Sequence, residues 1–265
     1  TDMVGGGPFT LEPGQWTDDT AMALCLAESL LESGGFDAND QMKRYLSWRQ
    51  DGVWSSTGRC FDIGNTIRQA LLVFEQSGNP LAGSEDPFSA GNGSIMRLAP
   101  IPMYYRAIPE HVPFYAALSS RTTHAARTAV DACRLLAVMT AGALNGVPKN
   151  ELLDKNYTLF DGCWIEEPLC AEIAEIAAGS YKEKELPDIQ GTGYVVKSLE
   201  AALWAFYRAD NFRDGCLMAA NLGNDADTTA AVFGQLAGAY YGEQEIPQNW
   251  LKKLTFAENI RSLAF

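Results

Sequence analysis

Apolar residues at helical spacing are the feature that most constrains how this chain folds. Between Thr123 and Asn145, apolar side chains recur every three or four positions and so line one face of a long helix. Glycine pairs or Gly/Pro segments at 34–35, 78–80 and 146–148 follow three such stretches and are typical helix stop signals. Alternating strand patterns joined by hairpin turns are not visible. The pattern predicts an all-α fold, with further helices at Asp19–Ser33, Gln41–Arg49, Gly64–Gln76, Val112–Ser119, Glu167–Ala178, Val196–Arg208, Phe212–Asn221 and Asp227–Gly242.

Length and composition favour one domain. The chain has 265 residues, of which 47% are hydrophobic, enough for a sizeable core. The sequence shows no internal repeat, and its Gly/Pro/Ser-rich loop at Leu81–Ser94 leads directly into a motif instead of separating two cores. We therefore predict a single domain over 1–265. Small residues at steps of four from Ala230 to Gly242 predict that a neighbouring helix approaches the last long helix closely.

Net charge and cysteine usage argue against several classes of function. Lys plus Arg is 20 and Asp plus Glu is 33, so the formal net charge is −13. This charge disfavours nucleic-acid and anionic-membrane partners. The six cysteines form no CxxC pair and there are only two histidines, which argues against a disulfide framework or a zinc site. No signal peptide or membrane-length apolar run is visible. We expect a cytoplasmic protein in which any metal is a hard cation bound by oxygen.

Two acidic clusters, about two hundred residues apart, carry the strongest chemical signal. Thr17-Asp18-Asp19-Thr20 and Asn224-Asp225-Ala226-Asp227-Thr228-Thr229 each precede an apolar helical stretch. Helix capping explains one such cluster, because Asp and Thr are favoured caps and acids suit the first turn. Capping needs only one side chain, however, and adjacent carboxylates repel each other unless a cation lies between them. If the fold brings both clusters together, their oxygens would surround one or two hard cations, which lower the pKa of a shared water.

Four further segments are ambiguous when each is taken alone. The glycines of Gly91–Arg97 let backbone N–H groups approach a phosphate, and an ordinary tight turn explains them as well. Asp62 either caps the helix that follows or acts chemically. His124 is either a structural hydrogen-bonding residue or a ligand contact, and Tyr194, after a short glycine loop, either stacks on a ring or packs.

Taken together, these segments resemble the ADP-ribosyl-glycohydrolase family. That family includes the bacterial enzyme that reactivates dinitrogenase reductase and the vertebrate ADP-ribosyl-acceptor hydrolases. The motifs follow the family's order and cover nearly the whole chain, and an early TDDT combined with a late DADTT before a small-residue helix is specific. The segments that carry the resemblance are Gly14–Thr20, Phe61–Thr66, Gly91–Arg97, Thr123-His124 and Gly223–Thr229. The resemblance implies an all-α orthogonal bundle with a binuclear magnesium or manganese centre in a central cleft.

The resemblance also implies a reaction and a role for each motif residue. The chain would cleave ADP-ribose from an ADP-ribosylated protein or small molecule, with two Mg²⁺ or Mn²⁺ ions binding the distal ribose and positioning a water that attacks the anomeric carbon. The implied catalytic residues are Asp18, Asp19 and Asp62, and Asp62 favours an arginine-linked substrate. The implied metal ligands are Thr17, Asp18, Asp19, Asp225, Asp227 and Thr228. The implied substrate contacts are Asn92, Gly93, Ser94, Met96, His124 and Tyr194.

The sequence departs from the family at its beginning. Relatives start with a helix bearing a Gly-Asp-Ala-Leu-Gly-like motif, and no such segment precedes Thr17, so we expect this chain to lack that helix. Three alternatives follow: a non-catalytic ADP-ribose- or metal-binding relative, a magnesium-dependent phosphoester hydrolase, or a structural protein on the same fold. The intact aspartates argue against the first, and the reaction products, free ADP-ribose or instead phosphate and AMP, distinguish the second.

Overall fold

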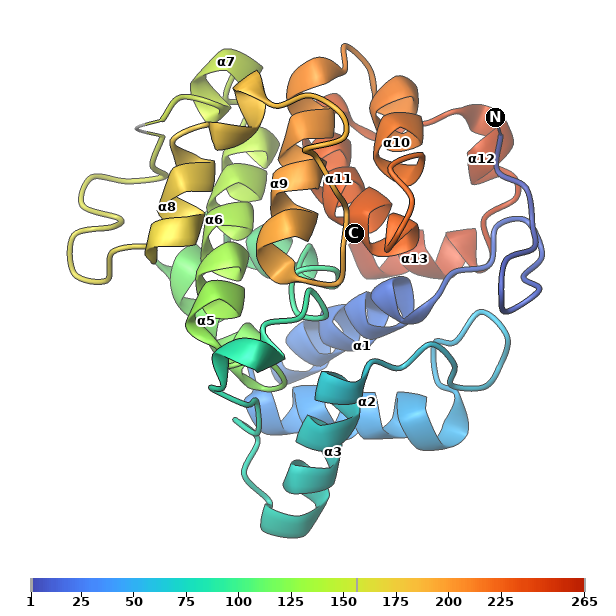
Figure 1. The fold of residues 1–265 in the computed structure, drawn as a ribbon. Helices are drawn as coiled ribbons and strands as arrows, with labels where there is room; N and C mark the ends of the chain where they lie inside the picture. The colour runs from blue at the N-terminus through green and yellow to red at the C-terminus, as the bar shows by residue number, and fades with distance from the viewer. Residues whose placement is uncertain (1, 156, 265) are drawn as a thin grey trace.

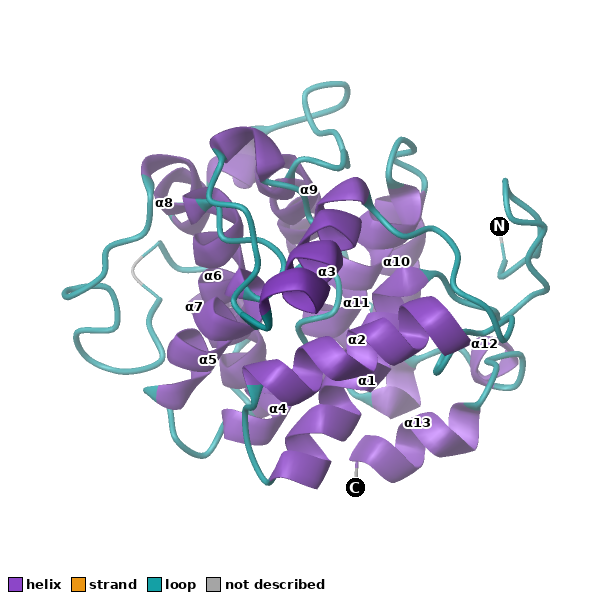
Figure 2. Ribbon diagram, turned by 90° about the horizontal axis from the view of Figure 1, so that it is seen from below, coloured by secondary structure: helices purple, strands orange, loops and turns teal. Residues whose placement is uncertain are grey.

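The computed structural model describes residues 2–155 and 157–264 and consists of helices joined by loops (Figures 1 and 2). The longer helices are α1 (Asp18–Ser33), α2 (Ala38–Asp51), α3 (Asn65–Ser77), α5 (His111–Arg121), α6 (Arg127–Leu144), α9 (Val195–Arg208), α10 (Phe212–Ala220), α11 (Ala226–Tyr241) and α13 (Ala257–Ala264). The shorter elements are η1 (Pro87–Ser89), α4 (Pro100–Tyr105), α7 (Lys149–Leu152), α8 (Ala171–Ala177), η2 (Ser180–Glu183), η3 (Glu243–Glu245) and α12 (Gln248–Leu251). Within this part of the chain only isolated β-bridges occur, which confirms the all-α prediction. None of these helices combines the length and the apolarity needed to cross a bilayer.

The predicted helices are present, but two of them begin later than the periodicity indicates. α6 begins at Arg127 instead of Thr123, because a tight turn precedes it: the His124 N–H donates to Ser120 O over 2.7 Å. α8 is confined to Ala171–Ala177, since Pro168 disfavours helical backbone just before it. The short helices α4, α7, α12 and α13 were not predicted, because four to eight residues are too few to show a clear helical period.

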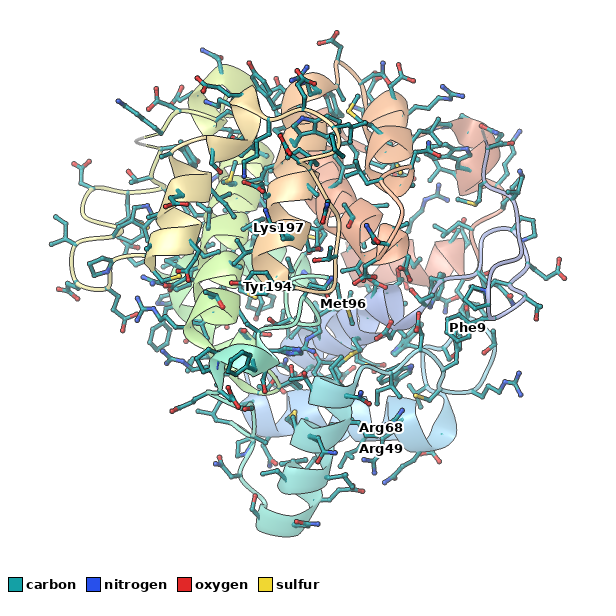
Figure 3. All side chains as sticks on the ribbon, in the orientation of Figure 1. Phe9, Arg49, Arg68, Met96, Tyr194 and Lys197 are labelled. Carbon is teal, nitrogen blue, oxygen red and sulfur yellow. The ribbon has the colours of Figure 1, made fainter. Side chains whose placement is uncertain are left out.

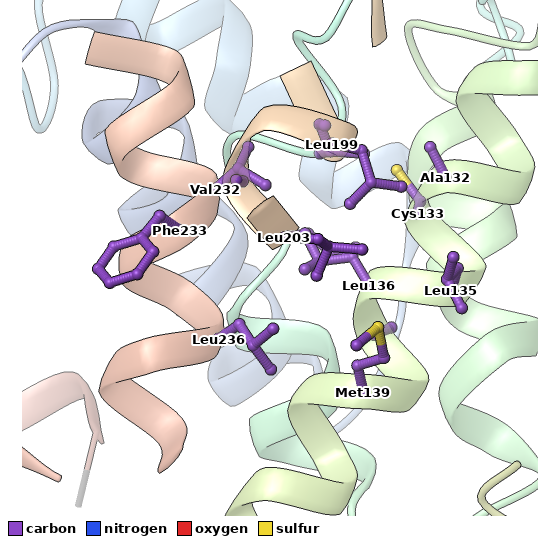
Figure 4. Packing of buried hydrophobic residues seen from close by; sticks show 14 of the residues in the cluster. Ala132, Cys133, Leu135, Leu136, Met139, Leu199, Leu203, Val232, Phe233 and Leu236 are labelled. Carbon is purple, nitrogen blue, oxygen red and sulfur yellow. The ribbon is translucent and has the colours of Figure 1, made fainter. Parts of the chain in front are cut away.

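The main hydrophobic core lies where α6, α9 and α11 pack together (Figure 4). Leu136 of α6, Leu203 of α9 and Val232 of α11 are almost fully buried in this cluster. α5 covers α6 from the outside, and α10 packs against both α9 and α11. The core therefore fixes α11, whose first turn carries the second acidic cluster.

A second, smaller core joins α1 to α2 and α3. Met22, Trp48 and Leu71, one from each helix, are buried there. α1 also packs against α4, α11 and α13, so it lies between the two cores. This position holds the start of α1, with the first acidic cluster, close to the start of α11.

The small residues at steps of four along α11, from Ala230 to Gly242, do not form the close helix contact that was predicted. α11 packs through its bulkier residues, including Val232, Phe233 and Leu236, which are buried. A Cβ atom added at Gly234 would meet no described atom within 4 Å, and one at Gly238 would meet only a ring carbon of Phe212, at 4.0 Å. The prediction of a close helix approach along these glycines is wrong, because the adjacent branched and aromatic face buries more apolar surface.

Candidate active site

The two acidic clusters meet at the N-terminal ends of α1 and α11. Thr17 Oγ1 lies 2.7 Å from Asp19 Oδ2 and 3.1 Å from Asp227 Oδ2, which joins residues 210 positions apart in the sequence. Asp18, Asp225 and Asp227 line the same pocket. The structure therefore brings the two acidic segments together, which is the condition that the sequence analysis set for a shared metal site.

Neither cluster caps its helix through a side-chain hydrogen bond. The N-cap residues of α1 and α11 are Thr17 and Asp225, and neither makes a capping hydrogen bond through its side chain. Asp62 does not cap α3 either, because the N-cap of that helix is Gly64. Asp62 instead lines the pocket with a left-handed backbone, φ +58°, a conformation that is uncommon for a non-glycine residue and is often found at functional sites. Capping therefore does not account for these carboxylates.

The pocket holds negative charge without a cationic side chain to balance it. Burial, and then the charge of Asp227, raises the pKa of Asp19 to about 7. Burial also raises the pKa of Asp18 well above its ordinary value, with further contributions from Asp19, Asp62 and Asp227. No ion pair among the described residues involves any of these aspartates. Ionising one carboxyl therefore makes ionising the next less favourable.

Asp225 and Asp62 extend this acidic wall. Burial raises the pKa of Asp225, although Asn92 Nδ2 donates a 2.8 Å hydrogen bond to its Oδ2. Partial burial, followed by the charges of Asp227 and Asp225, raises the pKa of Asp62 to about 6. A carboxyl with a pKa close to neutrality exchanges protons readily, so Asp62 has the properties of an acid or base.

The oxygen donors of the two clusters fit a hard divalent cation. Asp19 Oδ1 is buried without a hydrogen-bond partner, which leaves one carboxylate oxygen free to bind a ligand. Carboxylate and hydroxyl oxygens are the donors that magnesium and manganese prefer. In residues 2–155 and 157–264, no three His, Cys, Asp or Glu side chains converge into a ready-made metal site. The side chains that could contribute oxygen donors to a cation are the aspartates of both clusters and the hydroxyls of Thr17 and Thr228.

The glycine-containing segment forms another wall of the pocket. Gly91, Asn92, Gly93 and Met96 line it, and Figure 3 shows Met96 near the centre of the molecule, close to Tyr194 in that view. The N–H groups of Ile95 and Met96 donate to Asn92 O, as in the first turn of a helix. The Gly93 N–H makes no hydrogen bond within the described residues. This free donor lies on a residue that lines the pocket.

Ser94 departs from its predicted role. Its side chain is buried, and its Oγ lies 2.9 Å from Ser120 Oγ of α5 and 3.3 Å from Cys133 Sγ of α6. The hydroxyl is therefore part of the core and does not line the pocket. The sequence could not show this orientation, because it depends on how α5 and α6 pack against the turn.

His124 lies against the glycine segment and lines the pocket. A Cβ atom at Gly93 would lie only 2.8 Å from His124 Cε1 and 3.0 Å from Ile67 Cδ1. The φ angle of Gly93 is not positive, so this glycine is required by the close approach of the histidine and not by an unusual backbone. The imidazole ring itself is buried.

The loop before α9 links the second acidic cluster to the glycine segment. Gly191 O accepts a 2.9 Å hydrogen bond from the Asp225 N–H, and Gly193 O accepts a 3.0 Å hydrogen bond from the Asn92 N–H. A Cβ atom at Gly191 would lie 2.2 Å from Thr229 Oγ1, so only glycine fits there. These contacts hold the two walls of the pocket at a fixed separation.

Tyr194 lies beside the acidic pocket and not in it. Its side chain is 42% exposed and lines a neighbouring hollow of about 470 Å³ together with Phe88, which is fully exposed. This hollow and the acidic pocket share Thr66, Gly91 and Gly193, so the two cavities adjoin.

The acidic pocket has a volume of about 280 Å³ and includes residues that sequence reasoning missed. Asn65 and Thr66, in the first turn of α3, belong to the segment that was singled out only for Asp62. Their position next to Asp62 was the signal that could have found them. The other residues that were not predicted are Gly64, Ile67, Gly91 and Gly193.

Comparison with known proteins places this geometry in a family. A sequence profile described as ADP-ribosylglycohydrolase matches residues 1–264. The ADP-ribosylarginine hydrolase Tri1 of Serratia proteamaculans (strain 568) is 43% identical over 263 residues, which cover 99% of this chain and 69% of that protein. The Tri1 protein of Pseudomonas putida (strain GB-1) is 44% identical over 263 residues, or 99% of this chain and 68% of that protein.

More distant and structural matches agree. The ADP-ribosyl-[dinitrogen reductase] glycohydrolase of Rhodospirillum rubrum is 30% identical over 257 residues, which cover 95% of this chain and 78% of that protein. A solved structure described as an ADP-ribosylglycohydrolase-related protein complex is 43% identical and has a TM-score of 0.84, covering 99% of this chain and 84% of the other. The chain therefore belongs to the ADP-ribosylglycohydrolase family and is a glycohydrolase.

Proposed function

We propose that this glycohydrolase cleaves the N-glycosidic bond between ADP-ribose and an arginine side chain, and so reverses ADP-ribosylation with the help of two Mg²⁺ or Mn²⁺ ions. Two relatives at 43% and 44% identity are named ADP-ribosylarginine hydrolases, which supports the choice of linkage. The observation that carries the proposal is the set of aspartates at the pocket, whose carboxylates are buried and repel one another, and which form no ion pair with a lysine or arginine of residues 2–155 and 157–264.

The residues proposed to hold the ions come from both clusters. They are Thr17, Asp18, Asp19, Asp225, Asp227 and Thr228. Bound divalent ions supply Lewis-acid chemistry, lowering the pKa of a coordinated water and polarising ribose hydroxyls. Asn92 keeps the carboxylate of Asp225 in place through its 2.8 Å hydrogen bond, and Thr17 does the same for Asp19 at 2.7 Å. These contacts orient the oxygens before substrate arrives.

The rest of the pocket suits an ADP-ribosyl group. The free N–H of Gly93 can donate to a ribose or phosphate oxygen. The acidic pocket, about 280 Å³, is small for the whole group, and the adjoining hollow of about 470 Å³ offers space for the remainder. Tyr194 and Phe88 in that hollow present rings on which a flat base can stack.

Asp62 is the proposed acid or base. It lines the same pocket as Asp18 and Asp225, and its pKa of about 6 allows it to exchange a proton near neutral pH. In the ionised form its carboxylate attracts the guanidinium of the arginine acceptor, which makes the leaving group easier to place. When Asp62 is instead protonated, it can pass its proton to the departing guanidine nitrogen as the N-glycosidic bond breaks, and the resulting carboxylate can accept the proton that the attacking water releases.

The test is hydrolysis of ADP-ribosylated arginine, followed by product analysis with added Mn²⁺ or Mg²⁺ and again with EDTA. We expect free ADP-ribose only when metal is present. Asp18→Asn and Asp225→Asn should each lower turnover by at least about a hundredfold, because each removes a proposed ligand. Asp51→Asn, which changes an exposed carboxylate at the end of α2, is the matched control and should keep full activity.

Two results would contradict the proposal. Full activity of Asp18→Asn and Asp225→Asn together would exclude the aspartate site. Release of AMP or phosphate in place of ADP-ribose would identify a phosphoester hydrolase instead.

A further inference from the structure

We propose that Arg97 and Thr123 are positioning residues that hold His124 as a neutral imidazole with its proton on Nε2, aimed at the pocket, where it donates to an oxygen of the ADP-ribosyl group. The identity of the ligand rests on the proposed function, whereas the state of the imidazole does not depend on it.

The chain of contacts begins at Arg97, which is fully buried beneath the glycine segment. Its guanidinium lies over the ring of Tyr45, 4.6 Å from the centroid, and its Nη1 donates to Gly93 O over 3.1 Å. Its Nη2 donates to the hydroxyl of Thr123 over 2.7 Å and, over 3.3 Å, to that of Thr122. A guanidinium has only donors, so each of these oxygens accepts.

Thr123 connects Arg97 to the imidazole of His124 by hydrogen bonds. Its Oγ1 accepts from Arg97 Nη2 and lies 2.8 Å from His124 Nδ1. The hydroxyl has one hydrogen, and no other hydrogen-bond partner of Oγ1 occurs among the described residues. If Nδ1 accepts this hydrogen, both the threonine hydroxyl and Nδ1 have a hydrogen-bond partner. If Nδ1 carries a proton instead, the buried hydroxyl hydrogen is left without an acceptor, which disfavours that tautomer by about tenfold or more.

The opposite edge of the imidazole then presents an N–H to the pocket. A Cβ atom at Gly91 would lie 3.4 Å from His124 Nε2, and one at Gly93 would lie 3.1 Å from it. All three residues line the acidic pocket, and Nε2 has no partner within the described residues. A protonated Nε2 of a neutral ring only donates, so His124 can bind an oxygen but cannot act as a base through this atom.

Two further observations agree with a neutral ring. Burial, together with the charge of Arg97, lowers the pKa of His124 to about 3. Arg97 carries its positive charge on the Nδ1 side of the ring, to which Thr123 links it, while Asp18, Asp225 and Asp227 line the pocket that His124 also lines. The Nε2–H dipole of His124, directed away from the positive charge of Arg97 and toward these carboxylates, has the favourable orientation.

Nitrogen-15 NMR of the imidazole rings tests the tautomer directly. The chain has only His111 and His124, so a His111→Gln variant assigns the signals. We expect the His124 ring to be neutral and protonated at Nε2 throughout pH 5.5–8, as the pKa of about 3 requires. A ring protonated at Nδ1, or a charged ring at neutral pH, would overturn the proposal.

Three threonine variants test the positioning role. Thr123→Val removes the hydroxyl, and Arg97 keeps its bonds to Gly93 and Thr122. It should mix the His124 tautomers and weaken ADP-ribose binding by about tenfold, the size of one neutral hydrogen bond. Thr123→Ser keeps the hydroxyl and should restore both. Thr122→Val is the matched control, because Thr122 also accepts from Arg97 but has no bond to His124.

The outcomes separate this inference from the proposed function. An unchanged tautomer and unchanged ADP-ribose affinity in Thr123→Val would overturn the positioning role. Equal effects of Thr122→Val and Thr123→Val on the tautomer would do so as well, since the damage would then be structural. Failure of the wild-type protein to bind ADP-ribose in the presence of Mn²⁺ would instead overturn the proposed function, and the NMR spectrum would still decide the state of His124.

Discussion

Replacing Asp19 with Asn should stabilise the metal-free protein at pH 8, although it removes a residue proposed to be essential for activity. Asp19 is almost fully buried, and its pKa is raised from 3.8 to about 7. A change of that size corresponds to roughly 4 kcal/mol of unfavourable free energy for the ionised form in the folded state. Asn carries no charge but leaves its amide hydrogens where Asp19 Oδ1 has no partner, which costs about 1–2 kcal/mol. The expected net gain is about 2–3 kcal/mol.

The pH dependence of this gain has a definite sign. The folded protein keeps the Asp19 carboxyl protonated up to about pH 7, whereas the unfolded chain ionises it near 3.8. The contribution of the Asp19 carboxyl to the stability of the wild type is therefore fully present below pH 3.8 and is lost as the pH rises to about 7. Asn does not titrate. The advantage of Asp19→Asn should grow between these two pH values and stay constant above them.

Thermal unfolding in EDTA measures this difference. At pH 8 the melting temperature of Asp19→Asn should lie about 5–10 °C above that of the wild type. A hundredfold excess of Mn²⁺ over its dissociation constant should raise the stability of the wild type by about 2.7 kcal/mol and that of the variant by less. A variant that is less stable than the wild type in EDTA at pH 8 would show that burial and the neighbouring charge of Asp227 do not destabilise the ionised Asp19 carboxylate as argued.

Three further predictions concern the surroundings of the site. Gly93→Ala places a Cβ atom 2.8 Å from a carbon of His124, so it should lower the free energy of unfolding in urea by about 1–3 kcal/mol and weaken ADP-ribose binding. Gly64→Ala, whose added Cβ atom has its nearest contact at 4.0 Å, should leave the free energy of unfolding nearly unchanged. His124→Gln should flatten the loss of stability as pH falls from 6.5 toward about 3, because the folded protein keeps this imidazole neutral while the unfolded chain protonates it; an unchanged acid limb would contradict the burial argument. Leu203→Ala, in the core of Figure 4, should lower the free energy of unfolding by about 2–5 kcal/mol, and a loss below 1 kcal/mol would contradict the packing described.

The sequence predicted the fold class because helical periodicity is a local pattern, whereas the meeting of the two acidic clusters was a condition for a metal site and followed only from the resemblance to a family. Helical periodicity is visible within 15 residues, and the second carboxylates at Asp19 and Asp227 had no explanation as caps. The start of α6 was missed because a long-range contact decides it: the Ala125 N–H donates to Ser84 O, which holds the preceding turn out of the helix. The small-residue stripe misled because spacing shows which residues share a face but not which face is covered.

Inside the site too, the sequence shows which residues are neighbours but not where each side chain points. Asn92, Gly93 and Met96, which the resemblance implies as substrate contacts, line the pocket, since a turn exposes neighbouring residues to the same side. Ser94 does not, because two other helices capture its hydroxyl. The hydrogen-bond chain from Arg97 through Thr123 to His124 was not predicted: Arg97 is the last residue of the glycine-containing motif and was given no role there, and only the fold shows that it is buried. Sequence patterns therefore identify a wall of the pocket, but the direction of each side chain depends on tertiary packing.

The two hydrophobic cores explain how a chain can hold so many carboxylates together. One core fixes α11 against α6 and α9, and the other fixes α1 against α2 and α3. The clusters at Asp18-Asp19 and Asp225-Asp227 repel each other, so their approach is driven by apolar burial elsewhere and not by the site itself. Loosening either core should then separate the clusters before the whole chain unfolds. A protein destabilised in the α9–α11 core should accordingly lose affinity for divalent ions at urea concentrations at which its helical content is still intact.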